Sequence, residues 1–276
     1  MTILMAMLRS GEGRVGLVLL ALFAALALTA PFVFPGDPLA ISAPPLLAPF
    51  TDSAHPLGAD RLGRDIAAEL AWGSRTTLLV AVASALASLL LGCLVGTLAG
   101  FLGGWTDDVL MRLSDAFQTV PAFLLAMALI SVTGPSLPAI VLAIGAGAWP
   151  QPARIARAEI RSLRERDFVA SARVAGMHPL VIGFREILPN ALPPVISLAA
   201  IIAAAAVLIE AALSFLGFGD PNRPSWGSMV AEGRSLLRSA PSLSLVPGLA
   251  LVAMVLAIHL TGRGYAKALR VKEPVA

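Results

Sequence analysis

The stretch from Arg164 to Asn190, RERDFVASARVAGMHPLVIGFREILPN, is a charged island in a chain that is otherwise largely apolar. Ten charged residues lie between Arg157 and Glu186, and long apolar runs flank them on both sides. The order of residues indicates a folded element rather than an irregular charged loop. We read it as a helix, a glycine turn, a second helix and a proline stop.

The first half of the island is predicted to form a short helix. Asp167 is a fair N-cap for a helix over residues 168–175, and Gly176 stands where a C′ residue with positive φ is favoured. Small side chains would let another surface approach this helix closely, namely Ala170, Ser171, Ala172 and Ala175. Arg166 and Arg173 flank that surface and could pair with acidic groups of a partner. The alternative is an amphipathic loop helix that lies on a membrane.

The second half of the island is predicted to form another helix. Pro179 suits its first turn, and one apolar face is formed by Leu180, Phe184 and Ile187. Pro189 is expected to end this helix and to begin the next apolar segment.

Composition places the chain in a lipid bilayer. It has 276 residues, of which 57% are hydrophobic and 13% charged, against roughly 25% charged in soluble domains. The single cysteine, Cys93, excludes a disulfide framework. A net charge of +3 does not indicate nucleic-acid binding here, because basic residues of membrane proteins usually mark loop orientation.

The apolar runs predict six transmembrane helices and an all-α, polytopic membrane protein. A spanning helix needs about 20 apolar residues. The runs cover residues 15–34, 76–106, 116–153, 191–218 and 239–262. The third run is long enough for two helices and is broken by a strong turn signal, Thr133-Gly134-Pro135-Ser136.

Lysine and arginine bias predicts that both termini are cytoplasmic. With that orientation the inner segments are 1–14, 103–115, 154–190 and 263–276, and they hold 14 Lys and Arg residues. The outer segments, 35–75 and 217–242, hold 6. The island then lies inside. The N-terminus resembles a secretory signal, with Ala25-Leu26-Ala27 as a possible cleavage site. Its apolar run is longer than a usual signal core and supplies the odd span that places the island inside, so we predict an uncleaved anchor.

We divide the chain into four segments on this basis. Residues 1–35 form an N-terminal cytoplasmic segment and the first transmembrane helix. Residues 36–75 form an outer loop with a short amphipathic helix that Asp65 caps. Residues 76–265 form a core that contains the inner loop 159–190, and residues 266–276 form a cytoplasmic tail.

The island resembles the cytoplasmic "EAA" loop of permease subunits of ABC importers. That loop has a Glu-Ala-Ala triplet, three residues, a glycine and, downstream, Leu-Pro. Here the triplet position is Ala170-Ser171-Ala172, followed by Gly176 and Leu188-Pro189-Asn190. The spacing is kept, but the glutamate of the triplet is Ala170, so any salt bridge that the family makes through it is absent.

Other stretches are similar to the dipeptide, oligopeptide and nickel branch of that family. They are HPLGADRLGRD (55–65), EAALSFLGFG (210–219) and PSWGSMVAEGR (224–234). With the island, four motifs follow in order. One departure lies at 259–264, HLTGRG, where Arg263 stands in place of the aspartate usual in the branch.

The resemblance implies the type I fold of ABC importer permeases and a location in the bacterial cytoplasmic (inner) membrane. It implies that the helix over 167–177 couples to an ATPase. The residues that would dock are Arg166, Asp167, Phe168, Ala170, Ser171, Ala172, Arg173, Gly176 and Met177. Its implied partners are two ATPase subunits, a second homologous permease and an extracytoplasmic substrate-binding protein. The cargo, whether peptide, nickel or another small solute, stays open.

The chain itself is predicted not to be an enzyme. A P-loop requires Gly-Lys-Ser/Thr, yet the only lysines, Lys267 and Lys272, follow Ala266 and Val271. ATP would therefore be hydrolysed on a partner subunit. No cofactor is expected. A metal site is not expected either, because His259 has only His55 and His178 as histidine partners in the sequence.

Two features inside the predicted spans could each have one of two roles. A stripe of small residues recurs every four positions, Ser84, Ser88, Gly92, Gly96 and Gly100. It would pack against a helix of the same chain or against a second permease. Glu210, a carboxylate inside a span, would either bond to a neighbouring helix or act as a pathway or gate residue.

Two other functions were weighed against an importer permease. One is a stand-alone channel or ion-driven carrier, but carriers usually show internal repeats and midplane charges, and we find no convincing repeat and one midplane candidate. An intramembrane hydrolase could pair Ser214 with His259, but no motif supports it and it gives no role to the island.

Overall fold

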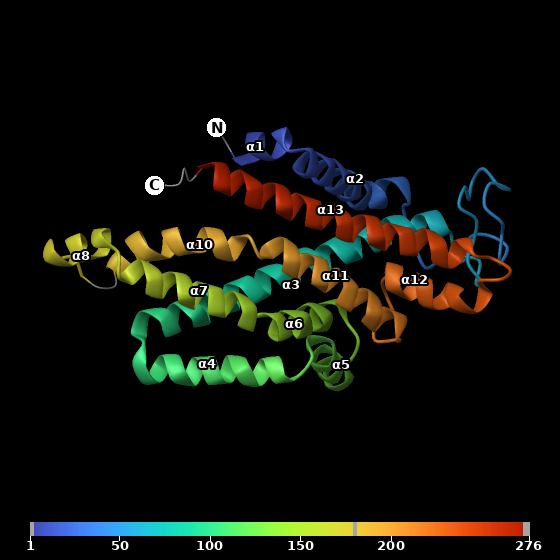
Figure 1. The fold of residues 1–276 in the computed structure, drawn as a ribbon. Helices are drawn as coiled ribbons and strands as arrows, with labels where there is room; N and C mark the ends of the chain where they lie inside the picture. The colour runs from blue at the N-terminus through green and yellow to red at the C-terminus, as the bar shows by residue number, and fades with distance from the viewer. Residues whose placement is uncertain (1–2, 179–180, 273–276) are drawn as a thin grey trace.

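The computed structural model describes residues 3–178 and 181–272, and these residues form a helical bundle (Figure 1). The helices are α1 (Ile3–Arg9), α2 (Gly11–Val33), α3 (Ile66–Leu102), α4 (Gly104–Thr119), α5 (Ala122–Thr133), α6 (Leu137–Ala148), α7 (Pro150–Arg164), α8 (Asp167–Val174), the π-helix η1 (Ile182–Ile187), α10 (Leu188–Ile196), α11 (Ala199–Phe215), α12 (Trp226–Gly233), the 3₁₀-helix η2 (Arg234–Leu236) and α13 (Ser242–Lys272). The described residues contain two isolated β-bridges and no strand, so the all-α prediction is confirmed.

Three helices are long and apolar enough to cross a bilayer: α2, α3 and the part of α13 from Ser242 to Leu269. Two bent pairs could each form one further span: α4 with α5, bent by 86°, and η1–α10 with α11, bent by 45°. The helix α6 is apolar but has 12 residues, about 18 Å against a hydrocarbon core of about 30 Å. The number of six spans therefore stays a prediction.

The turn predicted between residues 133 and 136 is present, but the helices around it differ from expectation. The helix α5 ends at Thr133, and Ser136 caps α6 by accepting a hydrogen bond from the Ala139 amide. The segment 103–115, predicted to be an inner loop, is most of helix α4. The helix α6 continues through Trp149, which has helical dihedrals, into α7.

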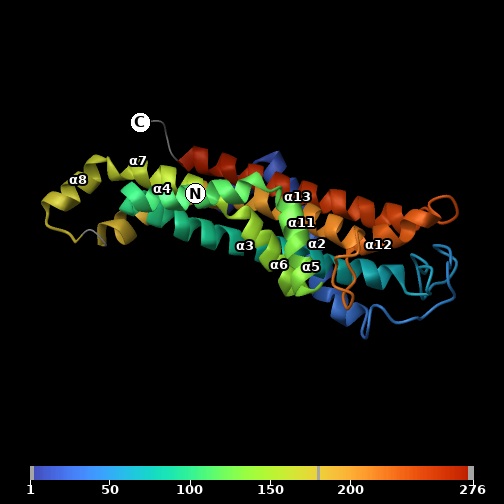
Figure 2. The same ribbon diagram turned by 90° about the horizontal axis from the view of Figure 1, so that it is seen from below.

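The bundle is elongated, with different elements at its two ends (Figures 1 and 2). The helix α8 forms one tip, and α1 and the end of α13 lie on that half of the molecule. The loop 36–65 and α12 lie at the opposite end. The described chain ends thus share the half that carries the charged island, while the side of the membrane to which that half belongs stays a prediction.

The helix α3 runs through the centre of the bundle as one continuous element of 37 residues, about 55 Å long. Asp65 is its N-cap, as predicted, and accepts a hydrogen bond from the Ala67 amide at 2.9 Å. The helix that Asp65 begins is not a separate amphipathic element of the outer loop, however. It continues without a break across the predicted boundary at residue 75, because no glycine-proline signal or cap interrupts it there.

The small residues of α3 face α6 and α7 of the same chain. A Cβ atom on Gly92 would come within 2.8 Å of the Trp149 carbonyl oxygen, and one on Gly96 would overlap the Ala153 carbonyl oxygen. Farther along, Gly100 lies against Ile160. Glycine therefore allows the α3 and α7 backbones to touch, which side chains of any size would prevent.

The helices α2 and α13 make a second close contact. Gly13 lies against Gly264, and Gly16 lies against Thr261. Next to this contact, the Glu12 carboxylate of α2 forms ion pairs with Arg263 at 3.1 Å and with Lys267 at 2.9 Å. The cation at position 263 thus has a carboxylate partner on the neighbouring helix.

We predict that Gly96→Ala will destabilise the protein, because the added methyl group would overlap the α7 backbone at Ala153, which cannot shift without disturbing the helix. Overpacking of this kind costs about 1–3 kcal/mol. The control is Gly248→Ala in α13, since nothing lies within 4 Å of a Cβ atom at that position. Thermal unfolding in detergent should give a lower midpoint for Gly96→Ala alone, and equal midpoints for the two variants would contradict the backbone contact.

Candidate functional site

The charged island folds into a helix that stands at one tip of the bundle (Figures 1 and 2). One side chain of α8, Val169, is fully buried, and it packs with Ile160 of α7 and with Ile182 and Ile187 of η1. The part-buried Ala172 and Met177 lie against the same cluster. A short helix is marginal by itself in water, so this apolar contact is what holds α8 in place.

The glycine turn after α8 is a Schellman motif. The Met177 amide donates to the Ala172 carbonyl at 3.1 Å, and the Gly176 amide donates to the Arg173 carbonyl at 3.0 Å. Gly176 has φ +76°, so the predicted positive φ is confirmed. No atom of residues 3–178 or 181–272 lies within 4 Å of the place where a Cβ atom would stand on Gly176.

The predicted docking residues divide into two groups. Ala172 and Met177 face the cluster that supports α8. The remaining residues are exposed: Arg166, Asp167, Phe168, Ala170, Ser171, Arg173 and Gly176. An exposed apolar side chain that the sequence reasoning did not single out is Val174, which is 90% exposed. The free surface of α8 thus combines apolar groups with two arginines.

The start of α8 differs by one position from expectation. Arg166 is the N-cap residue and makes no side-chain cap bond, while Asp167 is the first helical residue. A carboxylate in the first turn still complements the positive end of the helix dipole. Asp167 therefore stabilises the helix start by charge rather than by capping.

The second helix of the island does not stop at Pro189. The π-helix η1 leads directly into α10, which contains Pro189 in its first turn and Pro193 and Pro194 farther along. The Leu188 amide donates to Gly183, five residues back, and this wider turn relieves the clash that a proline ring makes in an α-helix. Pro179 and Leu180 lie outside the described residues.

Arginines of α7 tie α8 to the rest of the bundle, a role that the sequence reasoning missed. Arg164, next to α8, donates from Nη1 to the Gly100 and Phe101 carbonyl oxygens, both at 2.9 Å. These are carbonyls at the end of α3, where basic side chains commonly satisfy the free acceptors. The end of α7, from which the chain leads into α8, is therefore attached to the end of the central helix.

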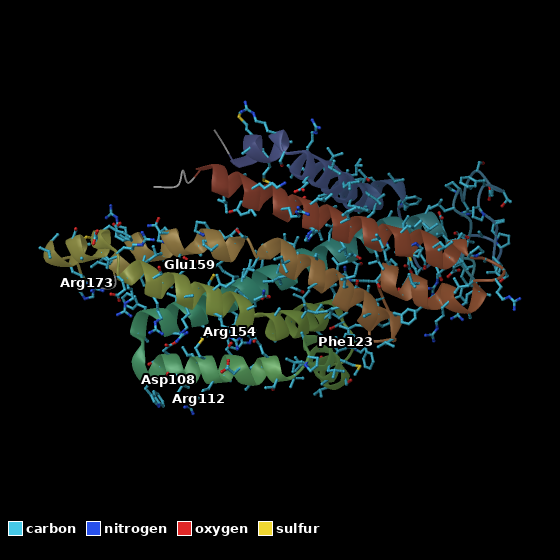
Figure 3. All side chains as sticks on the ribbon, viewed as in Figure 1. Asp108, Arg112, Phe123, Arg154, Glu159 and Arg173 are labelled. Carbon is cyan, nitrogen blue, oxygen red and sulfur yellow. The ribbon has the colours of Figure 1, made fainter. Side chains whose placement is uncertain are left out.

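A second set of arginines joins α7 to α4. Arg157 forms a bidentate ion pair with Asp107, which is nearly buried, and Arg161 reaches the same carboxylate at 3.3 Å. The hydrogen bonds to Asp107 raise the pKa of Arg157 above its ordinary value. Arg154 pairs with Asp115. Arg154 lies on the side of α7 toward α4, whereas Asp108 and Arg112 lie on the far side of α4 (Figure 3).

Three sequence motifs that are far apart in the chain meet at the opposite end. Arg64 pairs with Glu69 at 3.6 Å and with Glu232 of α12 at 3.8 Å. The fully buried Trp226 donates its indole N–H to the Leu70 carbonyl at 2.9 Å. The motifs at 55–65 and 224–234 thus form one folded unit around the start of α3.

The third motif, at 210–219, places Glu210 next to this unit. Glu210 is 1% exposed, and its Oε1 accepts a hydrogen bond from Ser214 at 2.7 Å, one turn along α11. The next residue, Ala211, touches Gly227 in the first turn of α12 so closely that a Cβ atom there would overlap it. Glu210 is therefore packed at the α11–α12 contact. Among the described residues no group of three or more His, Cys, Asp or Glu side chains is arranged to hold a metal ion.

Comparison with known proteins gives one family. Residues 88–271 match the family described as "Binding-protein-dependent transport system inner membrane component". A probable peptide ABC transporter permease protein of Sinorhizobium fredii is 40% identical over 245 residues, which cover 87% of this chain and 81% of that protein. A di/tripeptide transport system permease protein of Pseudomonas aeruginosa is 37% identical over 260 residues, covering 92% and 86%.

A solved structure shows a similar fold. It is a chain from inward-facing conformations of the MetNI methionine ABC transporter, with a TM-score of 0.58 and 18% sequence identity. The match covers 75% of the present chain and 97% of that chain. At this identity the likeness concerns the fold alone.

We predict that Gly176→Ala will loosen α8 without any steric clash, because only the positive φ is strained. The expected cost of about 1–2 kcal/mol would raise amide exchange across α8 by about fivefold or more. Gly176→Asn should give a smaller effect, since asparagine tolerates this conformation. Hydrogen–deuterium exchange on the purified chain measures both, and unchanged exchange in Gly176→Ala would contradict a role for the Schellman motif.

Proposed function

Because the chain belongs to the family of binding-protein-dependent transport system inner membrane components, we propose that it is a permease subunit of an ATP-driven importer, forming half of the transmembrane pathway. The observation that carries this proposal is the exposed face of α8 at the tip of the bundle. The sequence has no P-loop, so ATP is hydrolysed on a partner subunit that docks there.

The contacts of α8 support a role in transmitting force. Val169 joins α8 to α7 and η1, and Arg164 joins the adjacent end of α7 to the end of α3. The helix α7 in turn touches α3 backbone to backbone at Gly96. A movement of α8 would therefore be transmitted to the central helix α3 through α7, because these helices are joined by packing and hydrogen bonds. A switch between two discrete arrangements requires such coupling.

The chemistry of the docking face differs from that of the family motif. Position 170 is alanine, so no carboxylate is present there. The exposed side chains of α8 include Phe168 and Val174, which are apolar, Arg173, which is cationic, and Asp167, which is anionic. We propose that this surface seats in an apolar groove of the ATPase and that Arg166 pairs with acidic groups at its rim.

The remaining parts of the assembly follow from the same proposal. Two ATPase subunits and a second homologous permease complete the transporter, in a bacterial cytoplasmic (inner) membrane. Both termini and α8 are cytoplasmic, with six spans. An extracytoplasmic binding protein meets the opposite end, where the loop 36–65 and α12 lie. Relatives are named for peptide transport, and we propose peptides as the cargo.

For Glu210 we propose a packing role rather than a pathway role. Its carboxyl group is bonded to Ser214 of its own helix and lies at the α11–α12 contact. A residue of a transport pathway would need access to the cargo, but Glu210 is 1% exposed in this arrangement.

We predict that Glu210→Ala will lower the thermal unfolding midpoint, because it leaves the Ser214 hydroxyl without its partner and opens a cavity. Glu210→Gln should retain both the midpoint and peptide uptake in membrane vesicles, since an amide oxygen can still accept from Ser214. Loss of uptake by Glu210→Gln at an unchanged midpoint would instead assign Glu210 to the pathway.

The docking role of α8 is tested with matched tryptophan variants of two exposed serines, Ser171 on α8 and Ser162 on α7. Ser171→Trp should reduce the ATPase that co-purifies with the tagged chain from its native membrane by at least about tenfold. Ser162→Trp should retain it, and both variants should insert normally into the membrane.

Gly176 supplies a second test of docking. Among the described residues no atom lies within 4 Å of a Cβ atom on Gly176, so a larger side chain there starts in open space, and we expect the effect of its size to come from a partner. Gly176→Trp should abolish ATPase association, while Gly176→Ala should weaken it less. Normal association in Gly176→Trp and Ser171→Trp together would refute the proposed docking site.

A further inference from the structure

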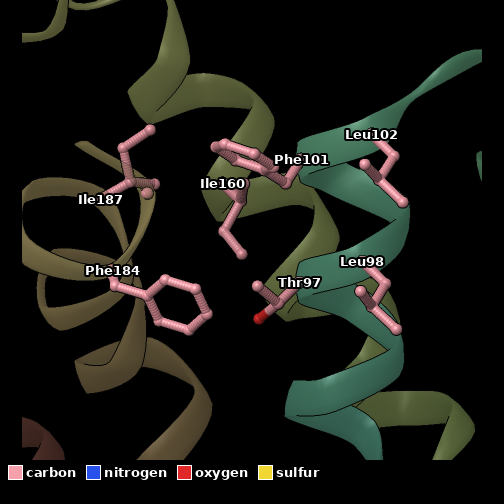
Figure 4. Close-up of a pocket in the computed structure, with 8 residues that line it drawn as sticks. Thr97, Leu98, Phe101, Leu102, Ile160, Phe184 and Ile187 are labelled. Atoms are coloured by element: carbon pink, nitrogen blue, oxygen red, sulfur yellow. The ribbon is translucent and has the colours of Figure 1, made fainter. Parts of the chain in front are cut away.

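A groove lies between the end of α3, the middle of α7 and the π-helix η1 (Figure 4). Its walls are apolar: Leu98 and Phe101 belong to α3, Phe184 and Ile187 belong to η1, and Ile160 belongs to α7. The cavity has a volume of about 130 Å³. In Figure 4, Phe184 and Thr97 face one another across it.

At the edge of the groove, Gly183 lets the backbone of η1 lie against the Phe101 ring of α3. A Cβ atom on Gly183 would lie 2.8 Å from the Phe101 ring. The outer edges of the groove are also apolar and exposed, with Leu102 at 59% and Phe184 at 66% exposure. In a protein that spans a bilayer, exposed apolar surface of this kind is compatible with contact to lipid chains.

A second cavity of about 280 Å³ adjoins the groove and shares Phe101 and Ile187 with it. It is lined by two arginines, Arg164 and Arg173. Arg164 uses Nη1 to cap α3, and its other nitrogen atoms have no hydrogen bond among the described residues. Neither arginine forms an ion pair with a carboxylate in the described part of the chain.

The two cavities lie at the end of the apolar helix α3, next to the arginines of α7 and α8. The helix α3 ends at Leu102, and the arginines stand just beyond its last turn, bonded to or near its final carbonyl oxygens. An apolar slot next to two arginines without a carboxylate partner among the described residues matches the chemistry of a phospholipid, since the acyl chain is apolar and the phosphate is anionic.

We propose that this site binds one anionic phospholipid, with an acyl chain in the groove and its phosphate on Arg164 and Arg173. The apolar lining of the groove suits a hydrocarbon chain, and the arginines of the adjoining cavity suit an anionic headgroup. Arginines bind phosphate through charge-assisted, often bidentate hydrogen bonds. A bound lipid would link the end of α3 to α8. The proposal does not depend on ATPase docking.

The test is native mass spectrometry of the full chain, purified with its associated subunits, stripped of lipid and then given phosphatidylglycerol or phosphatidylcholine with identical acyl chains. The anionic lipid should be retained about tenfold better, as expected for hydrogen bonds to charged groups. Arg173→Gln should reduce this preference to about twofold or less. Arg112→Gln, which removes an exposed arginine of α4, is the control and should keep the preference.

Filling the groove should remove both lipids. Gly183→Leu is the first filling variant, and Thr97→Phe is the second in case the first does not fold, which thermal unfolding reports. Gly248→Leu on α13 is the control, since a Cβ atom there has open space. Equal retention of the two lipids, or retention of phosphatidylglycerol by both filling variants, would overturn the proposal. Displacement of the lipid by inorganic phosphate, or its exclusion by a bound second permease, would also overturn it.

Discussion

The contact between the backbones of α3 and α7 is the constraint on which the rest of the structure depends. Lipid chains are as apolar as leucine, so helices in a bilayer gain little from hiding apolar surface and must instead pack closely. At Gly92, Gly96 and Gly100 the two helices approach until side chains of α3 have no room. This contact sets the position of α7 on the central helix.

The position of α7 determines where the charged island stands. With α7 held against α3, Arg164 reaches the free carbonyl oxygens at the end of α3, and Arg157 reaches Asp107 of α4. The helix α8 then extends beyond the bundle, supported by the single buried side chain of Val169 and closed by the turn at Gly176. Its exposed face is available to a partner because the support lies on the other side.

The same arrangement distinguishes the two ends of the molecule chemically. At the end opposite α8, motifs from three parts of the sequence form one compact unit through Arg64, Glu232 and Trp226. At the α8 end, the arginines of α7 and α8 lie around carbonyl oxygens and an apolar groove. The first end is held together by ion pairs and a buried tryptophan, whereas the second keeps Arg164 and Arg173 without a carboxylate partner among the described residues and leaves apolar side chains exposed.

The sequence by itself determined the properties that depend on local chemistry and composition. The apolar content predicted an all-α membrane protein, and the residue types alone predicted the cap at Asp65, the break after Thr133 and the positive φ of Gly176. Tertiary packing decided what long-range contacts control. A π-turn carries the helix past Pro189, the helix begun at Asp65 continues through the bundle, and Glu12 supplies a partner for Arg263. Local patterns cannot reveal these features, because each depends on atoms brought near by other helices or on a turn that widens to relieve strain.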